Sequence, residues 1–198
     1  MREFVLLSRQ GTTNPRFDAS DLGRVGLDTV ARCVSAAFCV SGHVRDDVVF
    51  HVFLGGPPSP PVHLRIDGSK LRSLDPSERG IGLLLSKALG SLRGGPQVQG
   101  VSATREGLER FVRGSCKGRR MYVLEEDGED VDEADLLGAV FVLGDKVGLP
   151  RKEELFLERF GASKLSLGPN RYFSSHCLVI LNYVLDRKAR ATGAFGNE

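Results

Sequence analysis

The C-terminal segment 165–187 most strongly limits how this chain can fold. It begins with Leu165-Ser-Leu-Gly-Pro169, an apolar run that ends in a Gly-Pro loop, and continues into a helix with apolar side chains on nearly every face. A helix that lies alone on a sheet normally keeps one polar face towards water. We therefore expect this helix to be covered on two sides, once by the sheet and once by a second surface.

A similar strand and loop precede this segment, with the sequence Val140-Phe-Val-Leu-Gly-Asp-Lys-Val-Gly-Leu-Pro150. Loops at the carboxyl ends of consecutive strands are where open α/β sheets bind ligands. Glycines in both loops allow the backbone to approach a ligand closely, and apolar neighbours could cover a flat ring. From spacing alone, glycines that simply end strands remain the simpler interpretation.

Strands and helices alternate along the sequence, which predicts an α/β fold with a mostly parallel sheet flanked by helices. We expect one domain over residues 1–198, with a single antiparallel hairpin formed by 47–54 and 62–66. Asp75 is expected to cap a helix that ends before Gly94, and the tail after Ala191 is expected to fray. The other expected strands cover 2–8, 98–101, 121–124, 139–143 and 165–167, and the other expected helices 27–41, a segment capped by Thr104, and 153–160.

Bulk properties exclude several classes of protein. No apolar run approaches the roughly 20 residues that span a bilayer, so we expect a cytoplasmic protein. The four cysteines form no C-x-x-C pair and have no zinc-like spacing with the histidines, so we expect reduced thiols and no metal. The net charge is only +2, but a basic stretch at 105–120 precedes an acidic one at 125–135. Charges segregated in this way could form a local basic surface that binds a polyanion, or they could simply form ion pairs exposed to solvent.

Common catalytic and nucleotide-binding motifs are missing. The sequence has no phosphate-binding P-loop, no G-x-G-x-x-G after its first strand, no G-x-S-x-G elbow and no H-E-x-x-H. Any nucleotide-like cofactor must therefore be held by the two C-terminal loops.

Specific residue runs carry a resemblance to a known family. These runs are Leu-Gly-Asp-Lys-Val-Gly-Leu at 143–149, Ser-Leu-Gly-Pro at 166–169, Ser-His-Cys at 175–177, Asn182, Arg32-Cys-Val-Ser-Ala-Ala-Phe38 and Asp75-Pro-Ser-Glu-Arg79. With them, the chain resembles the archaeal tRNA pseudouridine-54 N1-methyltransferases over almost its whole length. Those enzymes belong to the trefoil-knotted SPOUT class, which uses S-adenosylmethionine.

The resemblance implies a C-terminal knot, S-adenosylmethionine as cofactor, tRNA as substrate, and a homodimer that packs through the last helix. His176 is interpreted either as a structural residue near the helix start or as a contact at the cofactor's edge. Cys177 would contact the cofactor by packing or backbone, without acting as a nucleophile. The implied cofactor-lining residues are Leu143, Gly144, Gly148, Leu165, Ser166, Leu167, Gly168 and Cys177.

The acceptor chemistry calls for a carboxylate. Pseudouridine keeps a hydrogen on N1, and a nearby carboxylate could remove or orient it. The candidates for this carboxylate are Asp28, Asp46 and Asp47, of which we choose Asp28. It lies four residues before Arg32, however, and could simply pair with that arginine.

Phosphate contacts are expected from Arg32, Arg45 and Arg79. Three alternatives remain: an enzyme acting on pseudouridine in small-subunit ribosomal RNA, a non-catalytic RNA-binding or ribosome-assembly protein, and a generic nucleotide-binding domain.

Overall fold

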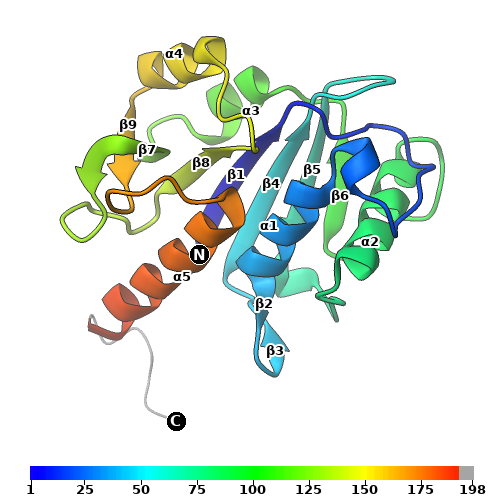
Figure 1. The fold of residues 1–198 in the computed structure, drawn as a ribbon, viewed down its shortest axis with the longest axis horizontal. Helices are drawn as coiled ribbons and strands as arrows, with labels where there is room; N and C mark the ends of the chain where they lie inside the picture. The colour runs from blue at the N-terminus through cyan, green and yellow to red at the C-terminus, as the bar shows by residue number, and fades with distance from the viewer. Residues whose placement is uncertain (192–198) are drawn as a thin grey trace.

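A computed structural model describes residues 1–191, so the predicted fraying after Ala191 lies outside the described residues. Its main feature is a seven-stranded sheet in the order β6-β5-β4-β1-β8-β7-β9 (Figure 1). The strands of this sheet are β1 (Arg2–Ser8), β4 (Val48–Leu54), β5 (Val62–Asp67), β6 (Val101–Thr104), β7 (Met121–Asp130), β8 (Val140–Gly144) and β9 (Ala162–Ser166). Strands β2 (Cys39–Val40) and β3 (His43–Val44) form a separate small hairpin.

Five neighbouring strands, β4, β1, β8, β7 and β9, run parallel to one another, which confirms the predicted mostly parallel sheet. The prediction of a single antiparallel element was wrong, because β6 also pairs antiparallel with β5. An edge strand has only one neighbour, and sequence pattern does not fix its direction. The expected strand 98–101 also starts later, since Val98 and Val101 bridge a turn at Gly100, whose φ is +77°.

Helices cover both faces of the sheet. Helices α1 (Asp28–Phe38), α2 (Glu78–Ser91) and α5 (Ser174–Ala191) pack on one face, and α3 (Leu108–Ser115) and α4 (Arg151–Arg159) on the other. Short 3-10 turns lie at Gly23–Val25 and Gly68–Lys70. Among residues 1–191, no helix combines the length and apolar character needed to cross a membrane.

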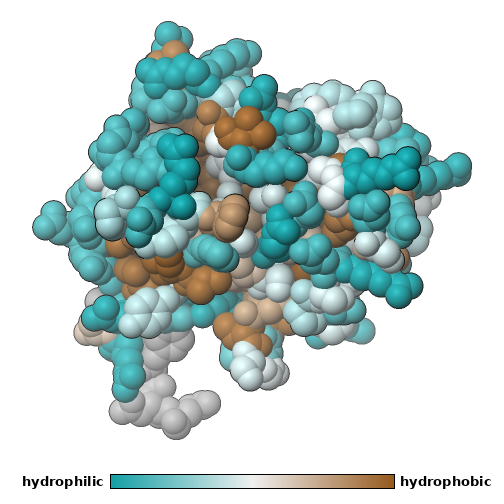
Figure 2. All heavy atoms as spheres, viewed as in Figure 1, coloured by the Kyte–Doolittle hydropathy of each residue, from teal (hydrophilic) through white to brown (hydrophobic). Residues whose placement is uncertain are grey.

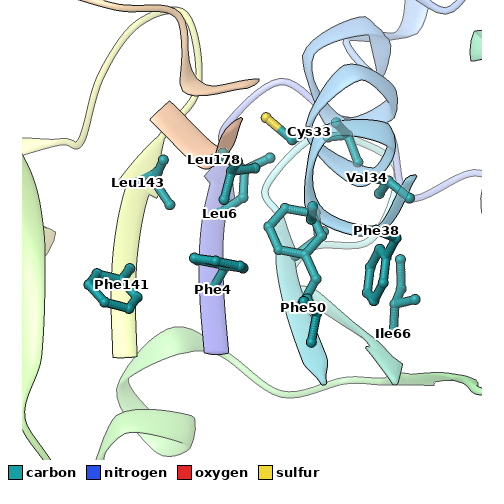
Figure 3. Close-up of a cluster of buried hydrophobic side chains, with 14 of the residues drawn as sticks. Phe4, Leu6, Cys33, Val34, Phe38, Phe50, Ile66, Phe141, Leu143 and Leu178 are labelled. Atoms are coloured by element: carbon teal, nitrogen blue, oxygen red, sulfur yellow. The ribbon is translucent and has the colours of Figure 1, made fainter. Parts of the chain in front are cut away.

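Strand β1 shows why this sheet is buried on both sides. Phe4 and Leu6 belong to the cluster beneath α1 and α5, whereas Val5 and Leu7 belong to the cluster beneath α3 and α4. Successive side chains of a strand point to opposite faces, so a strand between two helix layers is apolar without alternation. Figure 3 shows part of the first cluster, with Phe141, Phe4 and Phe50 on neighbouring strands and α1 next to Phe50.

Several helix boundaries differ from the predicted ones. Helix α4 covers Arg151–Arg159, where 153–160 was expected. Ser77, not Asp75, caps α2, since its Oγ accepts the Gly80 N–H at 3.0 Å while the Asp75 carboxylate accepts the Ser77 N–H at 2.9 Å. Gly107, not Thr104, precedes α3, because Thr104 is the last residue of β6. Helix α1 ends at Phe38, where the chain enters the small hairpin.

A partly buried ionic cluster fastens α5 to the amino end of the parallel strands. The Arg2 guanidinium donates to the Asn182 side chain at 3.0 Å and pairs with Asp47 at 2.9 Å and with Asp186. Arg45 pairs with the same Asp186 carboxylate at 2.6 Å. Burial raises the pKa of Asp186, but hydrogen bonds from Arg45 and Arg2 outweigh burial and hold this pKa below its usual value. We call these five residues the amino-end cluster.

Candidate functional site

A pocket of about 740 Å³ opens at the carboxyl edge of the parallel strands. Ligand pockets of small organic molecules measure roughly 300–1,000 Å³, so a cofactor-sized molecule fits. Its walls come from the end of β7, the loop after β8, the segment before α5, and the first turns of α1. A smaller hollow adjoins it and shares the wall formed by Leu124, Glu125 and Cys177.

Asp145 organises the loop between β8 and α4. One carboxylate oxygen accepts the Arg9 N–H at 2.8 Å, and the other accepts the Val147 N–H at 3.0 Å. The Asp145 carbonyl accepts the Gly148 N–H at 2.8 Å, which closes a tight turn. These bonds hold the loop against the end of β1 and fix the shape of one pocket wall before any ligand arrives.

Glycines leave the space and the backbone freedom that this wall requires. A Cβ on Gly144 would lie 2.3 Å from the Gly148 carbonyl carbon, so no other residue fits without displacing the loop. Gly148 and Gly168 have φ values of +81° and +121°, in the region that side chains disfavour. The two loops are tied together, because the Ser174 hydroxyl donates to the Gly144 carbonyl at 2.6 Å.

The structure brings the predicted cofactor-lining residues to one place. Gly144, Gly148 and Leu143 line the larger pocket, and Cys177 lines both hollows. Three others line the smaller hollow, namely Leu165, Leu167 and Gly168. Ser166 lines neither; its hydroxyl accepts the Gly168 N–H at 3.2 Å and so shapes the turn beneath. Their roles towards a ligand stay predictions.

Cys177 and His176 lie side by side where α5 begins. Burial raises the pKa of the Cys177 thiol to about 11, so the sulfur is protonated at neutral pH and is a poor nucleophile. The exposed His176 ring packs edge-on against Phe173 at 5.5 Å and lines the larger pocket. Its place fits both interpretations, a packed residue and a contact at the edge of a bound ligand.

Helix α1 supplies the opposite wall. Thr29 and Arg32 line the pocket, and Arg32 donates to Asp28 at 2.7 Å, which confirms the predicted pairing of these two residues. Arg32 also approaches Glu78 of α2 at 3.6 Å, which brings the exposed Arg79 near the same side. Arg45 lies in the amino-end cluster, at the other end of the strands.

Several lining residues were not predicted from the sequence. Glu125 and Glu126 follow the apolar part of β7, and Arg171, Tyr172 and Phe173 lie in the segment before α5. Arg171 pairs with Glu126 at 2.6 Å and links these two walls. A signal existed for the glutamates, because they follow directly after the predicted strand 121–124, whose carboxyl end lies at the ligand-binding edge.

A pocket of this kind, formed by glycine loops at the carboxyl edge of a parallel sheet, defines an α/β protein with a site for a small organic cofactor. A family model described as "putative SAM-dependent RNA methyltransferase" matches residues 1–190. The chain is 36% identical to the tRNA (pseudouridine(54)-N(1))-methyltransferase of Methanocaldococcus jannaschii, covering 95% of this chain and 98% of the relative. It is 38% identical to the protein of the same name from Methanocella arvoryzae, covering 95% and 100%.

A solved structure shares the fold. The crystal structure of Archaeoglobus fulgidus Nep1 bound to S-adenosylhomocysteine superimposes with a TM-score of 0.60 at 16% identity, covering 97% of this chain and 99% of that one. The chain therefore belongs to the family of S-adenosylmethionine-dependent RNA methyltransferases that includes the archaeal tRNA (pseudouridine(54)-N(1))-methyltransferases. The predicted knot stays a prediction.

The residues of the pocket fit S-adenosylmethionine, the cofactor of this family. Leu143, Leu124 and Leu149 give apolar surface for a flat base, and Gly144 allows the loop backbone at Gly148 to pack more closely than any Cβ would permit. The polar lining includes hydroxyls and carboxylates suited to ribose and amino groups. Within residues 1–191, no group of His, Cys, Asp or Glu is placed to hold a metal ion, and all four cysteines are free.

Proposed function

We propose that this protein methylates N1 of pseudouridine 54 in the T-loop of tRNA, with S-adenosylmethionine as methyl donor. One observation carries the proposal: the glycine-loop pocket lies in a chain that matches, over 95% of its length, relatives named for this activity. Bound S-adenosylmethionine would supply an electrophilic methyl group on a positively charged sulfur. The tRNA substrate places the proposed activity in the cytoplasm.

The acceptor chemistry explains why the base must already be isomerised. In uridine, N1 is joined to the sugar, whereas in pseudouridine the sugar is joined to carbon and N1 carries a hydrogen. In the transfer, a bond forms between N1 and the methyl carbon, the bond from methyl to sulfur breaks, and sulfur keeps the electron pair as a thioether. The N1 proton leaves to a base or to water.

Asp28 is the proposed group at the acceptor nitrogen. It opens α1, directly before the pocket-lining Thr29, and its carboxylate is held by Arg32 at 2.7 Å. A fixed carboxylate can accept the N1 proton or orient the N1–H bond, while the arginine limits how far it can turn away. Asp46 and Asp47 lie at the other end of the strands, where Asp47 pairs with Arg2, so the structure gives them less support.

The RNA side of the site is proposed to lie over the starts of α1 and α2. Arg32 and Arg79 lie there, and arginine matches phosphate geometry. The target base must turn out of the folded loop to reach a pocket of this depth. Arg45 was the third expected contact, but its guanidinium is engaged by both oxygens of Asp186, which gives it a structural use instead.

A homodimer through α5 is part of the proposal. Val179 and Tyr183 are 53% and 60% exposed, one helical turn apart on α5, and Figure 2 shows apolar surface over this helix. Val179→Glu is expected to shift the protein to monomers in light scattering coupled to size exclusion. Leu83→Glu, at an exposed apolar residue on α2, is the matched control and should leave the size unchanged.

The deciding experiment compares two tRNAs that differ at one base. Purified protein and radiolabelled S-adenosylmethionine are incubated with tRNA that carries pseudouridine at position 54, and with the same tRNA that carries uridine. Label is expected in the first tRNA alone. Equal labelling of both, or of neither, would overturn the proposal. Labelling of a small-subunit rRNA fragment instead would favour the ribosomal alternative, and RNA binding without S-adenosylmethionine binding would favour the non-catalytic one.

A further inference from the structure

We propose that Glu125 makes the cofactor pocket selective for the positively charged methyl donor over its neutral product. This inference rests on the proposed function, because it concerns S-adenosylmethionine and S-adenosylhomocysteine in the same pocket. The Glu125 carboxylate would strengthen binding of the donor, so that the product would be bound less tightly after transfer.

The position of Glu125 is the first argument. It follows Leu124 near the point where β7 loses its regular pairing with β9, and it lines both the larger pocket and the adjoining hollow. The glycine loops after β8 and β9 both reach these hollows, as does Cys177 at the start of α5. A carboxylate between two connected hollows lies close to whatever molecule fills them.

The second argument is the balance of charge around the pocket. Three other carboxylates at or beside it are neutralised or capped: Glu126 by Arg171 at 2.6 Å, Asp28 by Arg32 at 2.7 Å, and Asp145 by two backbone N–H groups. Within the described part of the chain, the Glu125 side chain has neither an ion pair nor a hydrogen bond. It is the carboxylate of the lining that still lacks a partner.

In the absence of a ligand, the surroundings of Glu125 disfavour its charged form. Burial first, and then repulsion from Glu154 and Glu126, raise the pKa of Glu125 above its usual value. Lys164 opposes them, but it is engaged by Asp127 at 2.9 Å and by Glu154 at 3.8 Å. A cationic ligand beside Glu125 would relieve this repulsion, and a neutral ligand would not.

The chemistry of the two molecules supplies the contrast. S-adenosylmethionine carries a sulfonium, an ammonium and a carboxylate, whereas S-adenosylhomocysteine has a neutral thioether in place of the sulfonium. Methyl transfer therefore removes one positive charge from the pocket. An unpaired, half-buried carboxylate attracts the molecule before transfer more strongly than the molecule after it.

The test measures the dissociation constants of both ligands by calorimetry. The ratio of the two constants reports the effect of the sulfonium charge, because the two ligands differ in that charge. In Glu125→Gln, which keeps the shape and removes the charge, binding of S-adenosylmethionine is expected to weaken about ten-fold, with S-adenosylhomocysteine changed less than about three-fold. Glu125→Asp keeps the charge and should keep most of the selectivity. Glu133→Gln makes the same change at an exposed glutamate outside both hollows and should leave the ratio unchanged.

Each outcome decides the inference. If Glu125→Gln weakens binding of both ligands equally, or changes neither dissociation constant, Glu125 does not distinguish the sulfonium from the thioether and the inference fails. The proposed function still stands in that case. If the wild-type protein binds neither ligand, the proposed function itself fails. Glu125→Ala serves as a second neutral variant should Glu125→Gln lose its native circular dichroism spectrum, and the same ten-fold criterion applies to it.

Discussion

The two ends of the parallel strands are built in opposite ways. At the amino end, Arg2 is almost fully buried and its guanidinium is shared among Asp47, Asn182 and Asp186. At the carboxyl end, the backbone turns at glycines, the pocket is open, and Glu125 has no partner among the described residues. Helix α5 connects the two, with its first turn in the pocket wall and its later turns in the amino-end cluster.

The two ends of the strands separate stability from function. An ion network centred on a buried arginine is costly to break, so it fixes the strands and α5 relative to each other. A carboxyl edge with glycine loops and unsatisfied groups contributes less to stability, but it leaves space and charge for ligands. Changes at the amino end should therefore affect unfolding, and changes at the carboxyl end should affect binding and catalysis.

The largest expected effect is at Gly144. Gly144→Val places side-chain atoms where the Gly148 and Leu149 backbone now lies, so the loop must move and S-adenosylmethionine binding should weaken more than about 100-fold. Isothermal titration measures the loss. Gly114→Ala in α3, where an added Cβ meets no atom within 4 Å, is the control and should bind normally. Near-normal binding by Gly144→Val would show that this loop does not hold the cofactor.

At the amino end, Arg2→Ala should lower the free energy of unfolding by about 3 kcal/mol, because it leaves Asp186 and Asn182 without their buried partner. Urea denaturation followed by circular dichroism measures the change. The folded variant should still bind S-adenosylmethionine within about three-fold of wild type. Arg93→Ala, at an exposed site, should change stability by less than about 0.5 kcal/mol. A strong loss of binding in folded Arg2→Ala would contradict the separation of the two ends.

Asp28→Asn tests the acceptor side of the pocket. The amide keeps the size of the side chain but cannot take the N1 proton, so kcat should fall about 100-fold while the Kd for S-adenosylmethionine stays unchanged. Asp46→Asn, at an exposed aspartate at the amino end, should leave kcat unchanged. Wild-type turnover by Asp28→Asn would remove Asp28 from the mechanism and leave proton loss to water or to another group.

The smallest expected effect lies between the two ends, on the face beneath α3. His51 Nδ1 and His63 Nε2 are 2.8 Å apart, and His63 Nδ1 lies 3.1 Å from Glu106. Burial first, and then the neighbouring His51, lower the pKa of His63 to about 4, while Glu106 opposes them and Arg65 adds to the lowering.

Because the folded pKa of His63 lies below the unfolded one, its contribution to stability is present above pH 6.5 and is lost as pH falls towards 4. Unfolding free energy should drop by roughly 2 kcal/mol over this range, and His63→Phe should flatten that slope. His43→Ala, at an exposed histidine, should keep it. An unchanged slope in His63→Phe would assign the pH dependence to other groups.

The sequence predicts the parallel strands well because they are apolar on both faces and end in glycines. Strand β1 was predicted with its observed bounds, and Gly144, Gly148 and Gly168 were found because only glycine suits such turns. The direction of β6 was missed, since an edge strand of four residues carries no pattern that fixes its neighbour's direction. The Ser77 cap was missed because Asp75 and Ser77 are both good caps; here the Asp75 carboxylate accepts the Ser77 N–H, and the Ser77 hydroxyl caps the helix.

The site was only partly predictable for a similar reason. The loops of residues 143–149 and 165–168 were assigned to the cofactor through the family resemblance, since spacing alone favoured glycines that simply end strands. The partners of charged side chains depend on contacts far apart in sequence. Arg171 meets Glu126 across 45 residues, and Arg45 meets Asp186 across 141. Such contacts decide which charges are satisfied and which, like Glu125, remain open for a ligand.

The chemical identity of the methylated nucleoside tests the proposed function most directly. Wild-type protein is incubated with S-adenosylmethionine and tRNA that contains pseudouridine 54, and the digested tRNA is separated by liquid chromatography with mass spectrometry against synthetic standards. We expect 1-methylpseudouridine, located at position 54 by fragment mapping. A methyl group on N3, on the ribose 2′-oxygen, or at another position of the tRNA would contradict the account.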